Sequence, residues 1–398
     1  MIPSYSRKAI SGQNNYLGMV TSHRMMETEM GYRGSKSEFA RDALSGYITN
    51  SVKEQRVDGS WSILIAKSKL MLLRCTLMGF ERNYQIKIPS KQLKYFSTFS
   101  SNNRLKPWFV TGLADSEGTF TIMIDQNLKR TLGWRVQAKF QIGLHKRDLE
   151  LVLQLQQFFG GIGSIGKSGN MVFYSVSSVK DLTSTIIPHF LNYSLLTQKA
   201  ADFLLFKAVV DLIINKAHLK FEGLNNIINI KASMNTGLSQ IVKSKFQIVP
   251  VKRPLIITSN IPDPYWISGF VSGEGTFDIK TYKSKTNTGY AVQLRFRIPQ
   301  HTRDKKLIET LTKYFGSGVI EKHTQFPAVT LVIVKFSHIL EKVIPFFELY
   351  PIIGIKQKDF IDWCFVARLM NDGSHLTIEG LKLILTIKEG MNKGRAKK

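Results

Sequence analysis

The feature that most constrains this chain is a pattern that occurs twice. Residues 107–122 read PWFVTGLADSEGTFTI, and residues 264–279 read PYWISGFVSGEGTFDI. The glutamates of the two copies, Glu117 and Glu274, are 274 − 117 = 157 residues apart. Each copy begins with Pro, which favours the first turn of a helix, and its apolar run ends at a Gly, which favours a helix end. The pattern therefore predicts two short, buried helices.

Small residues recur on one face of each predicted helix. Gly112 and Ser116 are four residues apart, and so are Gly269 and Gly273. Residues with this spacing lie on the same face of a helix, and the absence of bulky side chains lets two helix backbones approach closely. We expect the two helices to pack against each other.

This packing would place Glu117 and Glu274 together at the C-terminal ends of neighbouring helices. A carboxylate there is disfavoured by about 0.3–1 kcal/mol because the helix dipole is negative at this end. Two such acids in a very basic protein predict a site for Mg²⁺ that bridges the protein to a phosphodiester. The alternative is that each is a solvated acid at a helix end, but its recurrence beside matched small residues favours the paired site.

The duplication continues for the rest of both copies. His145, Arg147 and Asp148 return as His301, Arg303 and Asp304 at an offset of 156, and Lys199, Asp202 and Phe203 return as Lys356, Asp359 and Phe360 at an offset of 157. Each unit has the order helix, two strands, helix, two strands, helices. This order is typical of an α+β fold in which helices cover one face of a sheet and leave the other face for a ligand.

The second predicted strand of each unit alternates between apolar and polar residues. Trp134, Val136, Ala138, Phe140 and Ile142 alternate with Arg135, Gln137, Lys139 and Gln141, and Val292, Leu294, Phe296 and Ile298 alternate with Gln293, Arg295 and Arg297. A half-buried strand alternates in this way. Arg, Lys and Gln suit the edges of guanine and adenine in a major groove, although an ordinary solvated sheet surface has the same pattern. Two basic, acid-free faces at corresponding positions favour DNA.

Composition limits the class of protein and its partners. The chain has 398 residues, of which 43% are hydrophobic, and 55 Lys and Arg against 29 acids give a net charge of +26 and a pI near 9.9. This length and composition predict two domains with substantial cores plus an extra segment, and the charge predicts a polyanionic partner. Nucleic acid is the first choice and an anionic membrane surface the second. No apolar run reaches the ~18 residues of a membrane-spanning helix.

Two cysteines, Cys75 and Cys364, are too few for a disulfide framework or a cysteine-rich zinc site. They indicate a reducing compartment, and we expect neither to be catalytic. Residues 1–26 contain Arg7, Lys8 and Arg24 without an acid, which fits either a mitochondrial transit peptide or an ordinary basic tail.

The repeat also sets the expected domain boundaries. Residues 1–105 have no counterpart in either unit, and we expect a poorly defined N-terminal extension and linker there. The first repeated domain spans 106–237 and the second spans 263–398. Residues 238–262 contain Pro250, Pro254 and Pro262 and no repeated pattern, which indicates an interdomain linker.

At the repeated helices the chain resembles the LAGLIDADG homing endonucleases, in the single-chain form with two motifs encoded by group I introns. The matching nonapeptides are VTGLADSEG at 110–118 and ISGFVSGEG at 267–275, in which Ser272 replaces the sixth-position Asp of the first copy. The resemblance covers residues 107–398. It implies two pseudo-symmetric αββαββα domains packed through a central pair of helices, with saddle-like antiparallel sheets for DNA.

The resemblance also implies roles for individual residues. Glu117 and Glu274 would bind Mg²⁺ (or Mn²⁺) and be catalytic, and Lys199 and Lys356 match the basic residue that orients water or stabilises the transition state. From the residues alone, each lysine could equally be a helix-start lysine in solvent. Gln300 stands where the family often has a water-organising Gln, whereas the first unit has Leu144. The implied partner is double-stranded DNA, and no membrane is involved. The protein would act as a monomer in the mitochondrion.

Two other functions stay open at this point. An RNA-binding maturase that assists splicing of its own group I intron would use the same basic surface without needing the acids. A DNA-binding regulator that never cuts is a third class, against which the presence of both acids argues. His145 and His301 have no clustered second ligand, so we interpret them as helix-entry or phosphate contacts rather than catalytic groups.

Overall fold

The computed structural model describes residues 104–234, 237–258, 260–392 and 395. The expectations for the N-terminal extension, including a transit peptide and Cys75, lie outside these residues. In the part of the chain that is described, no helix is long and apolar enough to cross a membrane.

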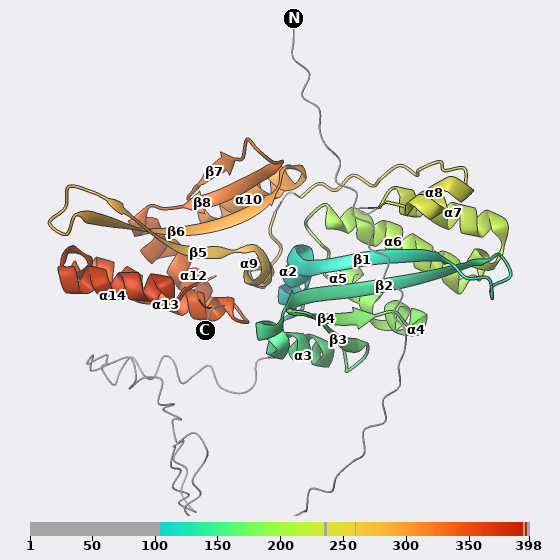
Figure 1. The fold of residues 1–398 in the computed structure, drawn as a ribbon, viewed down its shortest axis with the longest axis horizontal. Helices are drawn as coiled ribbons and strands as arrows, with labels where there is room; N and C mark the ends of the chain where they lie inside the picture. The colour runs from blue at the N-terminus through green and yellow to red at the C-terminus, as the bar shows by residue number, and fades with distance from the viewer. Residues whose placement is uncertain (1–103, 235–236, 259, 393–394, 396–398) are drawn as a thin grey trace, which may run out of the picture. The chain divides into compact units, whose positions relative to one another are not determined.

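The described chain consists of two α+β units joined by a linker, as the repeat predicts (Figure 1). The first unit contains α2 (Pro107–Glu117), β1 (Gly118–Gln126), β2 (Trp134–His145), η2 (Lys146–Asp148), α3 (Leu149–Phe158), β3 (Ser164–Ser168), β4 (Met171–Val176), α4 (Val179–Asp181), η3 (Leu182–Ile186), α5 (Ile187–Asn192), α6 (Lys199–Ile214), η4 (Ala217–Leu219) and α7 (Phe221–Ala232). The linker contains α8 (Gln240–Lys245). The second unit contains α9 (Pro264–Glu274), β5 (Thr276–Lys283), β6 (Tyr290–His301), η5 (Thr302–Asp304), α10 (Lys305–Phe315), β7 (Val319–Lys322), β8 (Ala328–Ile333), α11 (Phe336–His338), η6 (Ile339–Val343), α12 (Ile344–Leu349), α13 (Lys356–Asn371), η7 (Ser374–Leu376) and α14 (Ile378–Glu389).

Each unit contains one antiparallel sheet of four strands with the same topology. The strand order is β1-β2-β4-β3 in the first unit and β5-β6-β8-β7 in the second. The registers correspond, since Phe120 pairs with Phe140 and Phe277 pairs with Phe296. Helices cover one face of each sheet: in the first unit α6 contacts β1, and α3 contacts β3 and β4.

Each unit has its own hydrophobic core, with equivalent aromatic residues at its centre. In the first core Phe140 and Phe190 have ring centroids 5.3 Å apart, and in the second Phe296 and Phe347 are 5.5 Å apart. All four side chains are fully buried. Each contributes about 1.5–3 kcal/mol through the apolar surface it removes from water. The duplication of sequence is therefore also a duplication of packing.

Helices α2 and α9 pack against each other at the contact between the units, as the small residues predict. A Cβ atom on Gly112 would lie 2.0 Å from the carbonyl oxygen of Trp266, and one on Gly269 would lie 2.0 Å from that of Phe109. Any side chain at either glycine would therefore overlap the backbone of the other helix. This contact brings the C-terminal ends of α2 and α9 together.

The linker between the two units contains a short helix, α8. Val242 of this helix is buried against Leu224 and Ile228 of α7, and Trp134 of β2 packs edge-on against Phe246. This small cluster attaches the linker to the first unit.

The buried imidazole of His189, beside α2, should make the free energy of unfolding depend on pH. His189 packs against Phe158 and Phe190, and its Nε2 atom lies 3.2 Å from Oγ1 of Thr111. Burial lowers the pKa of His189 to about 4, from an ordinary value of 6.5, because the charged imidazolium loses its hydration. The unfolded chain therefore binds more protons than the folded chain between these two values.

The free energy of unfolding should fall on acidification through this window, and less so for His189→Gln. From pH 7 to pH 5 we expect the wild type to lose about 2 kcal/mol more than the variant, since each pKa unit corresponds to about 1.4 kcal/mol. Urea unfolding of both proteins at the two pH values measures this difference, in which the shared contribution of other groups cancels. Equal losses would show that His189 is not buried in its neutral form.

Candidate active site and nucleic-acid interface

The two repeated glutamates lie at the C-terminal ends of the packed helices. Glu117 ends α2 and Glu274 ends α9, and both are half-buried. Burial raises the pKa of Glu117, and burial followed by repulsion from Glu117 raises the pKa of Glu274. Two carboxyl groups that influence each other in a desolvated place are stabilised by a shared positive charge. The geometry thus fits the predicted cation site.

The two repeated lysines begin helices α6 and α13 and reach back to the ends of α2 and α9. Nζ of Lys199 donates to the carbonyl oxygens of Ala114 and Ser116, at 3.0 and 3.1 Å, and Nζ of Lys356 donates to that of Gly273. Each ammonium group therefore lies beside the glutamate of its own unit. Burial lowers the pKa of both lysines, that of Lys356 to about 8, although the nearby glutamates oppose this shift.

A third acid, Asp115, is buried next to this pair and has a structural role. Its carboxylate accepts hydrogen bonds from the backbone N–H groups of Leu196 and Thr197, from the Thr197 hydroxyl and from the indole of Trp266. Burial raises its pKa, and these donors oppose that rise. The bonds hold the loop before α6 against both α2 and α9.

The second unit has a simpler arrangement at the equivalent place. Oγ of Ser272 lies 3.2 Å from the backbone nitrogen of Ile353, which donates to it, and Ser272 donates in turn to the carbonyl of Ser268. A neutral hydroxyl thus replaces the Asp115 carboxylate, so the two halves of the site differ in charge.

None of the hydrogen bonds observed for Gln300 connects it to the glutamates or lysines of the site. It lies near the end of β6, and its Oε1 accepts from the backbone nitrogen of His301 at 2.9 Å. Its water-organising role stays a prediction. His145 and His301 accept hydrogen bonds from the backbone nitrogens of Arg147 and Arg303, which agrees with their interpretation as helix-entry residues.

The predicted DNA-binding residues lie on the uncovered faces of the two sheets. They alternate with buried apolar residues along β2 and β6, so they point away from the covering helices. An open hollow on the first sheet is lined by Met123, Gln137, Lys139, Gln141, Ser164, Gly166, Lys167, Phe173, Ser175 and Ser177. Three of the four residues predicted for this sheet thus lie in one depression.

The sheet faces are not acid-free, contrary to the expectation from the single strands. Asp125 of β1 binds Arg135 across the β1–β2 pair, and Oδ2 of Asp278 in β5 lies 3.0 Å from Nη2 of Arg295 and 2.6 Å from Nη2 of Arg297. The expectation considered β2 and β6 alone, whereas pairing places acids from the adjacent strands on the same face. These three arginines are therefore held by acids in the free protein.

The comparison with known families matches both repeats. The sequence profile described as "LAGLIDADG endonuclease" matches residues 110–210 and again residues 267–367. The chain belongs to the LAGLIDADG endonuclease family. Each match contains the glutamate, the polar strand and the lysine of one unit, so each match lies within one of the two units.

Relatives of the LAGLIDADG family agree in sequence and in fold. The "Probable intron-encoded endonuclease 3" of Neurospora crassa is 52% identical over 96% of this chain and 74% of its own length. The structure of the LAGLIDADG homing endonuclease I-SmaMI bound to cleaved DNA has a TM-score of 0.73 and 46% identity over 74% of this chain and 100% of that one. I-GzeII in complex with its DNA target has a TM-score of 0.69 and 44% identity over 73% of this chain. The protein is a DNA endonuclease of this family, and the maturase alternative is not favoured.

Endonucleases of the LAGLIDADG family depend on metal ions, and one structure shows I-SmaMI bound to an uncleaved DNA target in the presence of calcium ions. Among the described residues, no cluster of three or more His, Cys, Asp or Glu side chains could hold a metal. The glutamate pair fits a cation only if other oxygen atoms, such as those of a phosphodiester, complete its coordination. The donor set therefore suits a metal that binds together with DNA.

Proposed function

We propose that this protein is an intron-homing endonuclease that cuts both strands of a long, asymmetric DNA site with the help of Mg²⁺ or Mn²⁺. The observation that supports it most is the paired Glu117 and Glu274, half-buried at the ends of two helices and each beside a lysine. Asymmetry of the target is expected because the two sheet faces carry different residues.

Each residue has a proposed part in hydrolysis. Glu117 and Glu274 would hold divalent cations against the scissile phosphates, and a bound cation supplies charge that offsets the negative charge of the reacting phosphodiester. Lys199 and Lys356 present ammonium groups beside the acids, where they would stabilise the charge that develops on the phosphate oxygens. Gln300 would orient water in one half only, since Leu144 is its counterpart.

The sheet residues would bind and read the duplex. Gln137, Lys139, Gln141 and Gln293 have the donors and acceptors for base edges, and Arg135, Arg295 and Arg297 have positive charge for guanine or phosphate. We further propose a mitochondrial location, because relatives include a protein "in ND4 intron 1" of Podospora anserina and an "Uncharacterized mitochondrial protein RF1" of Saccharomyces cerevisiae. We propose a monomer because one chain contains both units and both glutamates.

The test is cleavage of the joined exons that flank the intron in the host gene. The purified protein is incubated with Mg²⁺ and a plasmid that carries this junction, and with a matched plasmid in which the intron interrupts it. We expect a linear product from the uninterrupted junction only. Binding without cleavage at every metal concentration would instead indicate a regulator.

Asp278 provides a separate test of the reading surface. Asp278→Ala should free Arg295 and Arg297, raise affinity for unrelated DNA and steepen its salt dependence, since each added phosphate contact changes the log–log slope by about −0.9. Preference for the target over unrelated duplex should fall by roughly tenfold, because two unrestrained arginines no longer favour one set of base edges. Competition titrations measure both quantities. Asp125→Ala, which frees only the exposed Arg135, is the matched control. An unchanged preference for the target in Asp278→Ala would mean that Asp278 only balances the charge of the two arginines.

A further inference from the structure

Two aspartates bind across the contact between the two units. Oδ1 of Asp304, at the start of α10 in the second unit, accepts from the backbone nitrogen of Gln198 in the first unit at 2.7 Å. Oδ1 of Asp148, at the start of α3 in the first unit, accepts from the backbone nitrogen of Ile355 in the second at 2.6 Å. The two bonds are equivalent under the repeat, and each crosses from one unit to the other.

Each bond ends one residue before a lysine of the site. Gln198 directly precedes Lys199, the first residue of α6, and Ile355 directly precedes Lys356, the first residue of α13. Backbone N–H groups at a helix N-terminus have no partner within the helix and carry partial positive charge. A carboxylate from the opposite unit supplies the partner, through a charge-assisted bond that is stronger than a neutral one.

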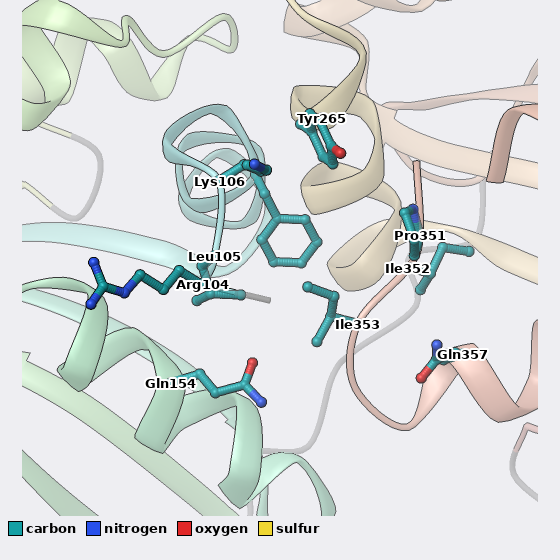
Figure 2. Close-up of a pocket in the computed structure, with 10 residues that line it drawn as sticks. Arg104, Leu105, Lys106, Gln154, Tyr265, Pro351, Ile352, Ile353 and Gln357 are labelled. Atoms are coloured by element: carbon teal, nitrogen blue, oxygen red, sulfur yellow. The ribbon is translucent and has the colours of Figure 1, made fainter. Parts of the chain in front are cut away.

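The loop before α13 lines a cavity on one side and is in close contact with Asp148. A cavity of about 150 Å³ is lined in part by Gln154 of α3, Gln357 of α13 and the loop residues 351–353. Figure 2 shows these side chains. A Cβ atom on Gly354, whose φ is +95°, would lie 2.5 Å from Oδ1 of Asp148. The carboxylate thus lies directly against the backbone of the loop and accepts the hydrogen bond from the backbone nitrogen of Ile355. This bond holds the residue that directly precedes α13.

The position of each helix start determines where its lysine can reach. Nζ of Lys356 donates to the carbonyl of Gly273, and Nζ of Lys199 donates to those of Ala114 and Ser116. Ser116 and Gly273 directly precede the two glutamates, so a shift of the helix start would withdraw the ammonium group from the site. A misplacement of about 1 Å can reduce a rate by up to roughly a hundredfold.

We propose that Asp148 and Asp304 are positioning residues that act across the two units, so that each half of the site depends on a carboxylate of the other half. Asp148 holds Lys356, and Asp304 holds Lys199. This inference rests on the proposed function, and it adds that each lysine, which lies beside the glutamate of its own unit, serves cleavage of a different strand. It gives the two cuts a physical connection besides the α2–α9 contact.

The two dependences should be unequal. The loop before α6 is also held by Asp115, whose carboxylate accepts from Leu196 and Thr197, whereas the loop before α13 has the neutral Ser272 at this place. Loss of Asp304 therefore leaves a second carboxylate at α6. Among the described residues, Asp148 provides the one observed carboxylate bond to the loop before α13. Loss of Asp148 should therefore have the larger effect.

Strand-resolved kinetics test the proposal. A duplex of the joined exons, labelled at a different end on each strand, is cut under single-turnover conditions by Asp148→Ala, Asp304→Ala, Lys356→Met and Lys199→Met. We expect Asp148→Ala to slow the strand that Lys356→Met slows, by about tenfold to a hundredfold, and to change the other strand less than about threefold. Asp304→Ala should slow the strand affected by Lys199→Met, by a smaller factor.

Controls separate positioning from folding. Asp148→Asn and Asp304→Asn keep an acceptor oxygen and should restore part of the rate, and Glu150→Ala removes an exposed acid two residues from Asp148 and should change neither strand. Affinity measured by gel shift should be unchanged in every aspartate variant. Equal slowing of both strands, or slowing of the strand that depends on the lysine of the same unit, would overturn the proposal while leaving the proposed function intact. Lysine variants without a strand bias would overturn the assignment of the lysines and the positioning role together.

Discussion

Glu117→Gln and Glu274→Gln should each abolish double-strand cleavage, with a loss of rate on the order of a thousandfold or more, while target binding is retained. Glutamine preserves the shape and one acceptor oxygen of the side chain, but it removes the negative charge that a divalent cation requires. Cleavage of the joined-exon plasmid and gel shifts on the same duplex measure the two effects separately.

Stability provides an internal control for these variants. Because burial raises the pKa of Glu117, and burial together with repulsion from Glu117 raises the pKa of Glu274, their charged forms should destabilise the folded protein at pH 8. The Gln variants should therefore unfold at the same temperature as the wild type or higher, which excludes misfolding as the cause of inactivity. Glu150→Gln changes an exposed acid and should cut normally. Undiminished cutting by either active-site variant would contradict the assignment of the glutamate pair.

Lys199→Met and Lys356→Met should slow single-turnover cleavage by roughly tenfold to a thousandfold without weakening DNA binding. An ammonium group beside the scissile phosphate interacts more strongly with the transition state, in which charge builds up on the phosphate oxygens, than with the bound substrate. Methionine has a similar length and flexibility, but it lacks both the charge and the hydrogen bonds that the ammonium group donates to Ala114, Ser116 or Gly273.

Lys358→Met is the matched control for the lysine variants. This lysine lies on the first turn of α13, near Lys356, but its side chain is exposed. It should affect the rate little. If the Lys199 and Lys356 variants bind weakly and then cut at the normal rate, these lysines anchor phosphates and have no catalytic role.

The sequence predicted the repeated architecture because local signals agree with one another along both units. Proline at residues 107 and 264 and the glycines that follow Glu117 and Glu274 mark both ends of α2 and α9. Strict alternation in β2 and β6 predicts which residues point to solvent. Local rules of this kind do not depend on distant parts of the chain.

The contacts that the sequence analysis missed are those that only tertiary packing creates. Asp148 and Asp304 were recognised as repeated residues, but their partners are 207 and 106 residues away. Asp278 pairs directly with Arg295, a register that neither strand reveals alone. Asp115 was seen as part of the motif, yet its partner Trp266 comes from the other unit. Recurrence of a short acidic residue just before a helix is the signal that could have drawn attention to the first pair.

The bond between Trp266 and Asp115 has a consequence for the origin of the two units. Under the repeat, Trp266 corresponds to Phe109 and Asp115 corresponds to Ser272. In a pair of identical first units, each buried Asp115 would therefore face a phenyl ring. In a pair of identical second units, each indole would face a serine. Loss of a partner to a buried polar group costs about 1–3 kcal/mol. The two units are thus complementary at this contact, and an assembly of two identical units would lack the bond that joins them.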